Sequence, residues 1–235
     1  MTYHAFICSR SAELTPTKKN LLRYLDNAGV KTKLIVGAES IFSGYEKAFR
    51  AAQPESEDII ILCHDDLEIL TPWDQAKEKI EEYLNKKETG FLGVAGTTEL
   101  ATDAVWWNKD CWEGGLLRGK VRHGLTLEDS YETAFGPSGS PYGEVVVMDG
   151  LFLVTKASTL RAIELKKPYY FTGGWDFYDI YYTSKAFRKK YKNYVIELDV
   201  LHNSKGELSG RKSWHENKEA FIKRNDLPLK IKWNI

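Results

Sequence analysis

Residues 59–63 read IIILC, five apolar residues in succession with no polar residue between them. A strand with one face in water alternates apolar and polar residues, whereas a strand covered on both faces is apolar throughout. The run therefore predicts a central strand of a sheet that has helices on both sides. It ends abruptly in His64, Asp65 and Asp66, three side chains that are able to bind a metal ion.

The neighbouring segments alternate between strand and helix patterns. Strands are predicted at residues 3–9, 31–38, 59–63 and 91–96, and helices are predicted to begin at Thr15-Pro16, Ser43 and Thr71-Pro72. This βαβαβαβ order is typical of an α/β sheet built largely from parallel strands. Further segments with the same patterns predict strands at 144–155 and 194–202, and helices at 157–165, 179–190 and 213–225.

The segment 97–143 differs from the rest of the chain, because it is rich in Gly, Trp and polar residues and shows little periodicity. It is expected to form a long loop, which inside a compact domain is usually functional or disordered. No linker divides the chain convincingly. Its 235 residues are therefore expected to form a single domain with a sizeable apolar core.

The charge balance and the cysteines limit the partners and the compartment. Lys and Arg number 33 against 33 Asp and Glu, which argues against a protein that binds nucleic acid mainly through phosphates. The first apolar run is too short for a signal peptide, and no segment approaches the ~20 apolar residues that span a bilayer. Cys8, Cys63 and Cys111 lack metal-ligand spacing and are expected to be free thiols in the cytoplasm of a bacterium or a virus-infected cell.

The polar residues that follow the central strand are placed where an α/β sheet binds its ligands, outside the carboxyl ends of the strands. Neighbouring residues of an extended segment point to opposite sides, so His64 and Asp66 are expected to share one face and Asp65 the other. Mg²⁺ and Mn²⁺ prefer one or two carboxylates together with phosphate oxygens. The alternative interpretation is a plain turn, because Asp-Asp is common after a strand.

Two later strands also carry polar residues. Asp149-Gly150 interrupts an apolar segment, where a carboxylate is costly unless it is paired or faces a cavity, and where Gly allows close approach of a ligand. His202 ends another apolar segment, and Ser204 follows it. A lone His is more often structural than a ligand. Three polar clusters at strand ends nevertheless predict that these residues converge at one edge of the sheet.

The stretch FTGGWDFYDIYY combines a glycine turn with two carboxylates. Asp176 and Asp179 are three residues apart at the start of a predicted helix and therefore share a face. They could stabilise the helix N-terminus, or one of them could be a general base directed into a cleft. The residues alone leave both interpretations open.

The order of CHDDLEI, VAGT, WW, RGKVRHG, VVMDGLFLV, GGWDFYDIYYTSKAF and LHNSKGE resembles the GT-A-fold glycosyltransferases, in particular a glycosyltransferase-like branch related to the large inverting family two. The resemblance extends from about Phe6 to Pro228. It implies an α/β GT-A fold with a single Rossmann-like, mixed and mostly parallel sheet flanked by helices. It also implies a nucleotide-binding half at about 1–96, an acceptor and catalytic half at about 97–215, and a C-terminal helix and tail at 216–235.

The resemblance implies a role for each matching residue. The metal ligands would be Asp66, His202 and Asp65. The nucleotide would contact Ser9, Arg10, Ser11, Glu39, Ser40, His64 and Asp65. The donor sugar and the acceptor would lie near Asp149, Gly150, Trp106, Trp107, Gly174, Trp175 and Ser204. The base would be Asp179 or Asp176, and Asp179 is preferred because the branch's acidic residue two positions after Phe-Tyr-Asp is Tyr181 here.

The implied activity is transfer of a sugar from a nucleotide-diphosphate sugar, UDP-sugar above all, to an acceptor hydroxyl, with Mn²⁺ or Mg²⁺ as cofactor. A glycan is the expected acceptor; a peptide, or a hydroxymethylated base of viral DNA bound by Arg118, Lys120, Arg122 and His123, is an alternative. A sugar-nucleotide pyrophosphorylase would need a Gly-rich phosphate loop after the first strand, and FICSRSAEL has no glycine. A non-catalytic nucleotide-sugar-binding domain would not need both a metal ligand and a base.

Overall fold

The computed structural model describes residues 1–136, 141–204 and 211–231. The helices in these ranges are α1 (Pro16–Asn27), α2 (Ile41–Ala52), α3 (Trp73–Leu84), α4 (Lys109–Glu113), α5 (Ala157–Ile163), α6 (Tyr178–Arg188) and α7 (Lys212–Ile222). None of them is long and apolar enough to cross a membrane.

The main sheet has seven strands in the order β10-β13-β5-β12-β3-β1-β2. Their bounds are β10 (Gly143–Val145), β13 (Lys192–Val195), β5 (Thr89–Gly93), β12 (Phe152–Lys156), β3 (Ile59–His64), β1 (Tyr3–Ser9) and β2 (Lys31–Val36). β1 pairs in parallel with β2 and β3, and β13 pairs in parallel with β5, whereas β12 and β10 run antiparallel to their neighbours. The sheet is therefore mixed.

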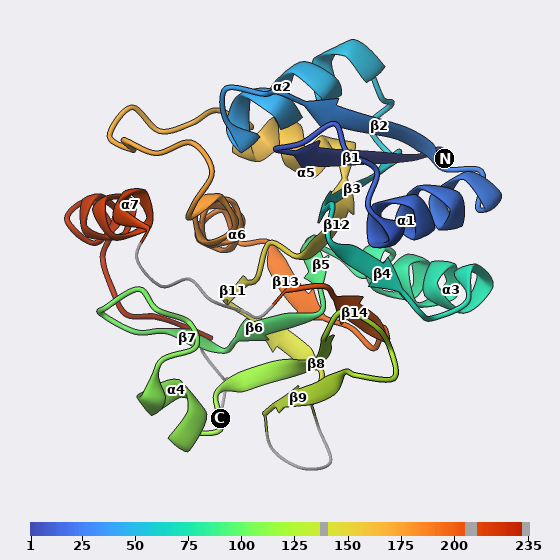
Figure 1. Ribbon diagram of the computed structural model, residues 1–235. Helices are drawn as coiled ribbons and strands as arrows, with labels where there is room; N and C mark the ends of the chain where they lie inside the picture. The colour runs from blue at the N-terminus through green and yellow to red at the C-terminus, as the bar shows by residue number, and fades with distance from the viewer. Residues whose placement is uncertain (137–140, 205–210, 232–235) are drawn as a thin grey trace.

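A second sheet has the order β11-β6-β8-β14-β4, and β9 pairs with β8 outside this path. The strands are β11 (Val147–Met148), β6 (Ala95–Thr97), β8 (Leu117–His123), β14 (Val200–His202), β4 (Leu67–Ile69) and β9 (Tyr131–Phe135). A two-stranded sheet joins β15 (Leu229–Lys230) to β7 (Glu99–Leu100). The second sheet lies next to the carboxyl end of β3, since β4 follows β3 directly in the chain (Figure 1).

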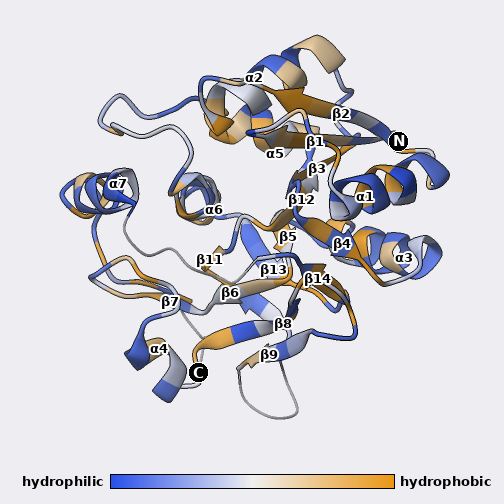
Figure 2. Ribbon diagram, in the orientation of Figure 1, coloured by the Kyte–Doolittle hydropathy of each residue, from blue (hydrophilic) through white to orange (hydrophobic). Residues whose placement is uncertain are grey.

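The central strand has the environment that its sequence predicts. Ile59 to Cys63 are each at most 1% exposed, because β3 lies between β1 and β12 and helices cover both faces of the sheet. Helices α1 and α3 lie on one side, and α2, α5 and α6 lie on the other (Figure 1). Apolar residues are concentrated in the central strands, whereas the helices carry both hydrophilic and hydrophobic residues (Figure 2).

The segment 97–143 is expected from the sequence to be a loop, and this expectation is wrong where the segment forms regular structure. It contains α4 and the paired strands β8 and β9. Burial along β8 alternates with a period of two, and Leu117, Gly119 and Val121 are the buried residues. Gly119 conceals this pattern in the sequence. It has φ +119° and packs so closely on the backbone of Val94 that a side chain would not fit.

Three predicted strands are each divided, because the chain passes from one sheet to the other within them. Residues 91–96 belong to β5 and β6, residues 144–155 to β10, β11 and β12, and residues 194–202 to β13 and β14. As a correction to the sequence-based expectation, Asp149-Gly150 lies in the turn between β11 and β12 and not inside a strand. A continuous apolar run therefore did not mean a continuous strand.

Candidate active site

Three side chains from distant segments meet at the carboxyl end of β3. His64 is the last residue of β3, Asp66 lies in the turn before β4, and His202 is the last residue of β14. β14 pairs antiparallel with β4, so that His202 lies opposite Leu67 and next to Asp66. One ligand atom from each of the three residues lies within 4.8 Å of the others, which gives a group that could hold a metal ion. We call this group the triad.

The orientation of His64 in the triad is fixed by Tyr178. The Tyr178 hydroxyl donates its proton to the carbonyl of Gly150 at 2.9 Å, and it lies 2.9 Å from Nε2 of His64. Since the hydroxyl has only one proton, Nε2 of His64 must donate to it. Nδ1 is then the unprotonated nitrogen, and it faces Asp66 Oδ1 at 3.7 Å. A second hydrogen bond of this kind is typical of metal-binding histidines.

The charges of the triad also fit a cation. Asp66 Oδ1 is buried without a hydrogen-bond partner in the described part of the chain, while Oδ2 lies 3.5 Å from His202 Nε2. Burial opposes ionisation of both groups, but their contact outweighs it, so the pKa of Asp66 is lowered and the pKa of His202 is raised. Burial lowers the pKa of His64, which favours its neutral, metal-binding form.

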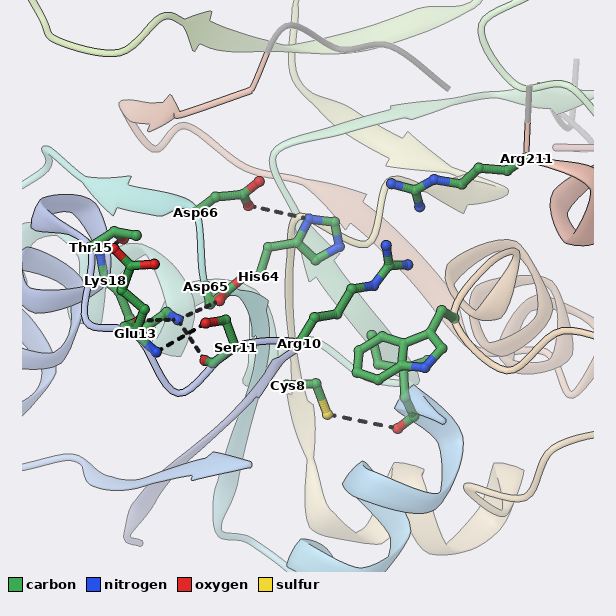
Figure 3. Close-up of a pocket in the computed structure, with 12 residues that line it drawn as sticks. Cys8, Arg10, Ser11, Glu13, Thr15, Lys18, His64, Asp65, Asp66 and Arg211 are labelled. Carbon is green, nitrogen blue, oxygen red and sulfur yellow. Dashed lines mark hydrogen bonds and ion pairs between the residues drawn. The ribbon is translucent and has the colours of Figure 1, made fainter. Parts of the chain in front are cut away.

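Asp65 points away from the triad. Its Oδ2 lies 3.0 Å from Nζ of Lys18 (Figure 3). The same oxygen accepts the Ser9 hydroxyl at 2.5 Å. The alternation between Asp65 and Asp66 is thus the one that an extended chain predicts, but the resemblance also counted Asp65 among the metal ligands, and here it lies outside the triad. Its carboxylate is available to the neighbouring cavity instead.

Lys18 was missed by the sequence analysis. Its side chain is 2% exposed, and Nζ binds Ser9 Oγ, Asp65 and the carbonyl oxygens of Ser11 and Glu13. It fixes the loop that follows β1. A lysine in the first turn of a helix is unfavourable for the helix dipole. This local conflict was the only signal that the residue has another task.

A polar cavity of about 300 Å³ opens beside the triad (Figure 3). It is lined by Cys8, Arg10, Ser11, Glu13, Thr15, Lys18, Ile41, His64, Asp65, Asp66, Trp175 and Arg211. Of the predicted nucleotide contacts, Arg10, Ser11, His64 and Asp65 line it, and Ser9 supports it from behind. Glu39 and Ser40 do not line it; Ser40 caps α2 by accepting the backbone N–H of Ser43.

An aromatic cavity of about 420 Å³ lies on the other side of the triad. Its walls are formed by His64, Asp66, Ala95, Trp106, Trp107, Trp112, Val121, His123, Tyr131, Phe135, Asp149, Leu151, His202, Ser204 and Arg211. The two cavities share His64, Asp66 and Arg211. Two members of the triad, His64 and Asp66, therefore separate the polar cavity from the aromatic cavity, and the third, His202, lines the aromatic cavity only.

The residues that were predicted to contact the sugar and the acceptor lie partly at the aromatic cavity and partly near the polar cavity. Trp106, Trp107, Asp149 and Ser204 line the aromatic cavity, whereas Gly174 and Trp175 lie on the side of the polar cavity. Trp106 is only 3% exposed and belongs mostly to the core. Trp112, Tyr131 and Phe135 also line this cavity, and the sequence did not point to them because they lie outside the motifs that carry the resemblance.

Asp149 and Asp179 flank Gly150. Asp149 lines the aromatic cavity, and its Oδ1 accepts the N–H of Leu151 at 2.8 Å. Asp179, in the first turn of α6, accepts the N–H of Gly150 at 3.0 Å and that of Ile180 at 2.9 Å, and it does not line either cavity. Burial and the charge of Asp149 raise the pKa of Asp179 to about 7.

Asp176 has a different environment from Asp179, although both are near the start of α6. It is 6% exposed, and its two carboxylate oxygens bind Arg211 at 2.9 Å and the Ser213 hydroxyl at 2.6 Å. Both oxygens are thus already engaged, and neither faces an acceptor hydroxyl. Its geometry therefore does not favour the role of base.

The basic residues of β8 are largely neutralised within the fold. Lys120 pairs with Glu132 at 3.3 Å, and Arg122 pairs with Glu132 and Asp199 at 3.1 and 3.0 Å. Arg118 donates to the carbonyls of Gly115 and Leu117. The positive surface that a DNA strand would need is accordingly weak on this strand.

One solved structure shares the fold of this chain, and a second is similar to it at a lower score. The structure of GalNAc-T7 with UDP, GalNAc and Mn²⁺ has a TM-score of 0.59 and 10% sequence identity; the alignment covers 86% of this chain and 44% of that chain. The crystal structure of A197 from STIV has a TM-score of 0.49 and 14% identity, with coverage of 87% and 86%. The search of curated proteins found no significant match. The fold is that of the GT-A glycosyltransferases.

A family model described as "Glycosyltransferase like family" matches residues 15–226. The chain belongs to this glycosyltransferase-like family, and it is a transferase enzyme. The resemblance and the fold class that the sequence motifs implied are thus confirmed.

Proposed function

We propose that this protein is a metal-dependent glycosyltransferase that takes a sugar from a nucleotide-diphosphate donor and places it on a hydroxyl of a glycan. One observation carries the proposal: His64, Asp66 and His202 converge where the two cavities adjoin, since His64 and Asp66 line both cavities and His202 lines the aromatic one. A cation at this point would be in reach of a donor on one side and an acceptor on the other.

The metal would be held by Nδ1 of His64, a carboxylate oxygen of Asp66 and Nε2 of His202. Two imidazoles and one carboxylate suit Mn²⁺ better than Mg²⁺, which prefers oxygen ligands. When bound, the cation would offset the negative charge of a departing diphosphate. The same ligand set also occurs in iron oxygenases, so a metal titration of this protein has to include Fe²⁺ and Zn²⁺ beside Mn²⁺.

The polar cavity is the proposed donor site. Ser11 and Asp65 at its far end offer hydrogen-bonding groups to a nucleoside, Lys18 holds them in place from below, and Arg10 offers a positive charge nearer the triad. UDP is the favoured nucleotide, because GalNAc-T7, which shares the fold, was solved with UDP and Mn²⁺. A cavity of about 300 Å³ is at the lower end of the usual size for small-molecule sites.

The aromatic cavity is the proposed acceptor site. Trp107, Trp112 and Phe135 present flat apolar rings, against which the apolar face of a sugar ring can stack while its hydroxyls bind polar groups. A glycan is preferred over a modified DNA base, since the basic residues of β8 are already paired with Glu132 and Asp199.

The acceptor hydroxyl is a weak nucleophile, and a positioned base typically accelerates such a step ~10²–10⁴-fold. The sequence favoured Asp179 for this role, but its oxygens accept backbone N–H groups behind the cavity wall. In our proposal Asp149 accepts the proton, because it lines the aromatic cavity. Asp179 positions it by holding the N–H of Gly150.

Ligand-dependent thermal stability tests this proposal. Nucleotide sugars, nucleoside diphosphates and each divalent cation are added singly and in pairs, and the Tm is measured. A ligand at 100 times its Kd stabilises the native state by about 2.7 kcal/mol. The proposal requires that one nucleotide sugar raises the Tm more in the presence of Mn²⁺ than without it. Equal Tm values for all combinations would contradict it.

A further inference from the structure

Arg211 lies where three cavities meet. It lines the polar cavity, the aromatic cavity and a third, open space of about 590 Å³ that we call the outer groove. Arg10 and Trp175 line the polar cavity and the outer groove. The guanidinium groups of Arg10 and Arg211 point into the same space beside His64 (Figure 3). Of the described residues, Arg211 alone lines all three spaces.

The position of Arg211 is fixed by a buried carboxylate. Its NH1 lies 2.9 Å from Oδ1 of Asp176, whose other oxygen accepts the Ser213 hydroxyl. Asn217 donates to the backbone carbonyl of Asp176 at 3.1 Å. A guanidinium has five N–H donors, and this pairing uses only one side of it. The side chain of Arg211 is 44% exposed, so its remaining donors are open to a ligand.

Trp175, the residue before Asp176, positions Arg10. The guanidinium carbon of Arg10 lies 5.1 Å from the ring centroid of Trp175, which is a cation–π distance. Arg10 pairs with no carboxylate in the part of the chain that the structure describes. The dipeptide Trp175-Asp176 therefore holds both arginines, Arg10 by its ring and Arg211 by its carboxylate.

The loop that carries this dipeptide is itself firmly anchored. Ile41, the first residue of α2, donates its N–H to the carbonyl of Gly174 at 2.9 Å. Side chains at Gly173 and Gly174 would collide with Ser213 and Ser40, respectively. The glycine pair thus allows the loop to pack directly between the N-termini of α2 and α7, which explains the sequence Gly-Gly-Trp-Asp.

Arg10 and Arg211 place two positive charges around one space next to the triad. Such a space favours a ligand with negative charge. Guanidinium groups bind phosphate oxygens through paired, charge-assisted hydrogen bonds. We propose that Arg10 and Arg211 form a clamp for the diphosphate of the donor, on the side of that group away from the triad. This inference rests on the proposed function and assigns a task to Asp176 and Trp175, which position the clamp.

The clamp would act when the donor bond breaks. The bond between the anomeric carbon and the bridging oxygen is cleaved, and its electron pair remains on the diphosphate, which gains one negative charge. The acceptor oxygen forms the new bond to the anomeric carbon, and its proton passes to the base. Arg10 and Arg211 would stabilise the added charge on the leaving nucleoside diphosphate.

The experiment measures the binding of inorganic pyrophosphate by calorimetry in the presence of Mn²⁺. Arg211→Gln and Arg10→Gln are each expected to raise its Kd about 10- to 100-fold, the usual effect of a charge-assisted hydrogen bond. Lys212→Gln is the matched control. Lys212 follows Arg211 in the chain, but it lines only the outer groove and pairs with Glu216, so its loss should change the Kd less than twofold.

A double-mutant cycle tests the positioning role of Asp176. Asp176→Asn should weaken pyrophosphate binding by a smaller factor than Arg211→Gln, and it should add nothing in the Arg211→Gln background. A purely structural residue would have the same effect in both backgrounds, which would overturn this role.

The outcomes separate the clamp from the proposed function. If the wild-type protein binds pyrophosphate with Mn²⁺ but Arg211→Gln and Arg10→Gln bind it equally well, the clamp is refuted and the proposed function stands. An equal loss for Lys212→Gln would also refute the clamp, because net charge alone would then explain the effect. If the wild-type protein binds neither pyrophosphate nor a nucleoside diphosphate, both proposals fail.

Discussion

Asp66 and His202, which are far apart in the sequence, approach each other to 3.5 Å between Oδ2 and Nε2. The pairing of β4 with β14 creates this contact, and the backbone N–H of Asn203 strengthens it by donating to the carbonyl of Asp66 at 2.8 Å. A carboxylate and an imidazole that are held in this way form two corners of the triad. The pairing of two strands therefore sets the geometry of the proposed metal site.

Asp66→Asn should abolish Mn²⁺ binding, because the amide loses the charge and one of the oxygen ligands of the triad. The matched control is Asp65→Asn, one residue earlier in the chain. Its carboxylate faces Lys18, so this variant should bind Mn²⁺ with unchanged affinity. Calorimetric titration with Mn²⁺ measures both. Loss of binding in the control as well would place Asp65 among the ligands.

Tyr178→Phe should weaken Mn²⁺ binding about 10- to 100-fold, because the hydroxyl that holds His64 in the Nδ1-ligating tautomer is lost. Tyr182→Phe is the control. It removes another buried hydroxyl, one that donates to the carbonyl of Leu165, and leaves His64 untouched. Equal Mn²⁺ affinities in the two variants would show that the tautomer is not controlled by Tyr178.

Asp149→Asn should lower kcat by about 10²- to 10⁴-fold and leave the binding of donor and Mn²⁺ intact, because the amide cannot accept the proton of the acceptor hydroxyl. Turnover is measured with the donor that the thermal-stability screen identifies. A variant with wild-type kcat would exclude Asp149 as the base, and Asp179 would then be the remaining candidate.

Asp179→Asn should stabilise the protein more at pH 8 than at pH 5. The pKa of Asp179 is about 7 in the folded protein, through burial and the charge of Asp149, and near 4 when unfolded. The folded state therefore binds the proton more tightly, and the wild type loses stability as the pH rises through this window. The variant lacks this loss. Its advantage should grow by on the order of 1–3 kcal/mol between the two pH values, as measured by urea unfolding; an advantage independent of pH would contradict the raised pKa.

Trp112→Ala should raise the KM for a glycan acceptor several-fold and leave donor binding unchanged, since Trp112 lines the aromatic cavity and is 44% exposed. It is a better test than Trp106, whose burial in the core would make the variant unstable. Tyr169→Ala removes an aromatic ring that is 89% exposed and lines neither cavity, and serves as the control. Comparable losses of donor and acceptor binding would indicate that Trp112 is structural.

The sequence determined the central strand, the class of fold and the residues at the strand ends. These features depend on local patterns: an uninterrupted apolar run, alternating strands and helices, and polar residues where apolar segments stop. The motif order also identified the family that the comparison later confirmed. Each of these signals can be read from a few consecutive residues, because burial on both faces of a sheet and chain reversal each require particular residue types within a short segment.

Only the tertiary structure decided which of the polar residues meet. The pairing of β4 with β14 brings His202 to Asp66, and the hydrogen bond that His64 donates to Tyr178 determines which nitrogen of His64 faces them. The tertiary structure also pairs Asp176 with Arg211 and places Asp149 in the wall of the aromatic cavity. These outcomes depend on contacts between residues far apart in the chain, where β-pairing and side-chain hydrogen bonds set directions that no local pattern contains.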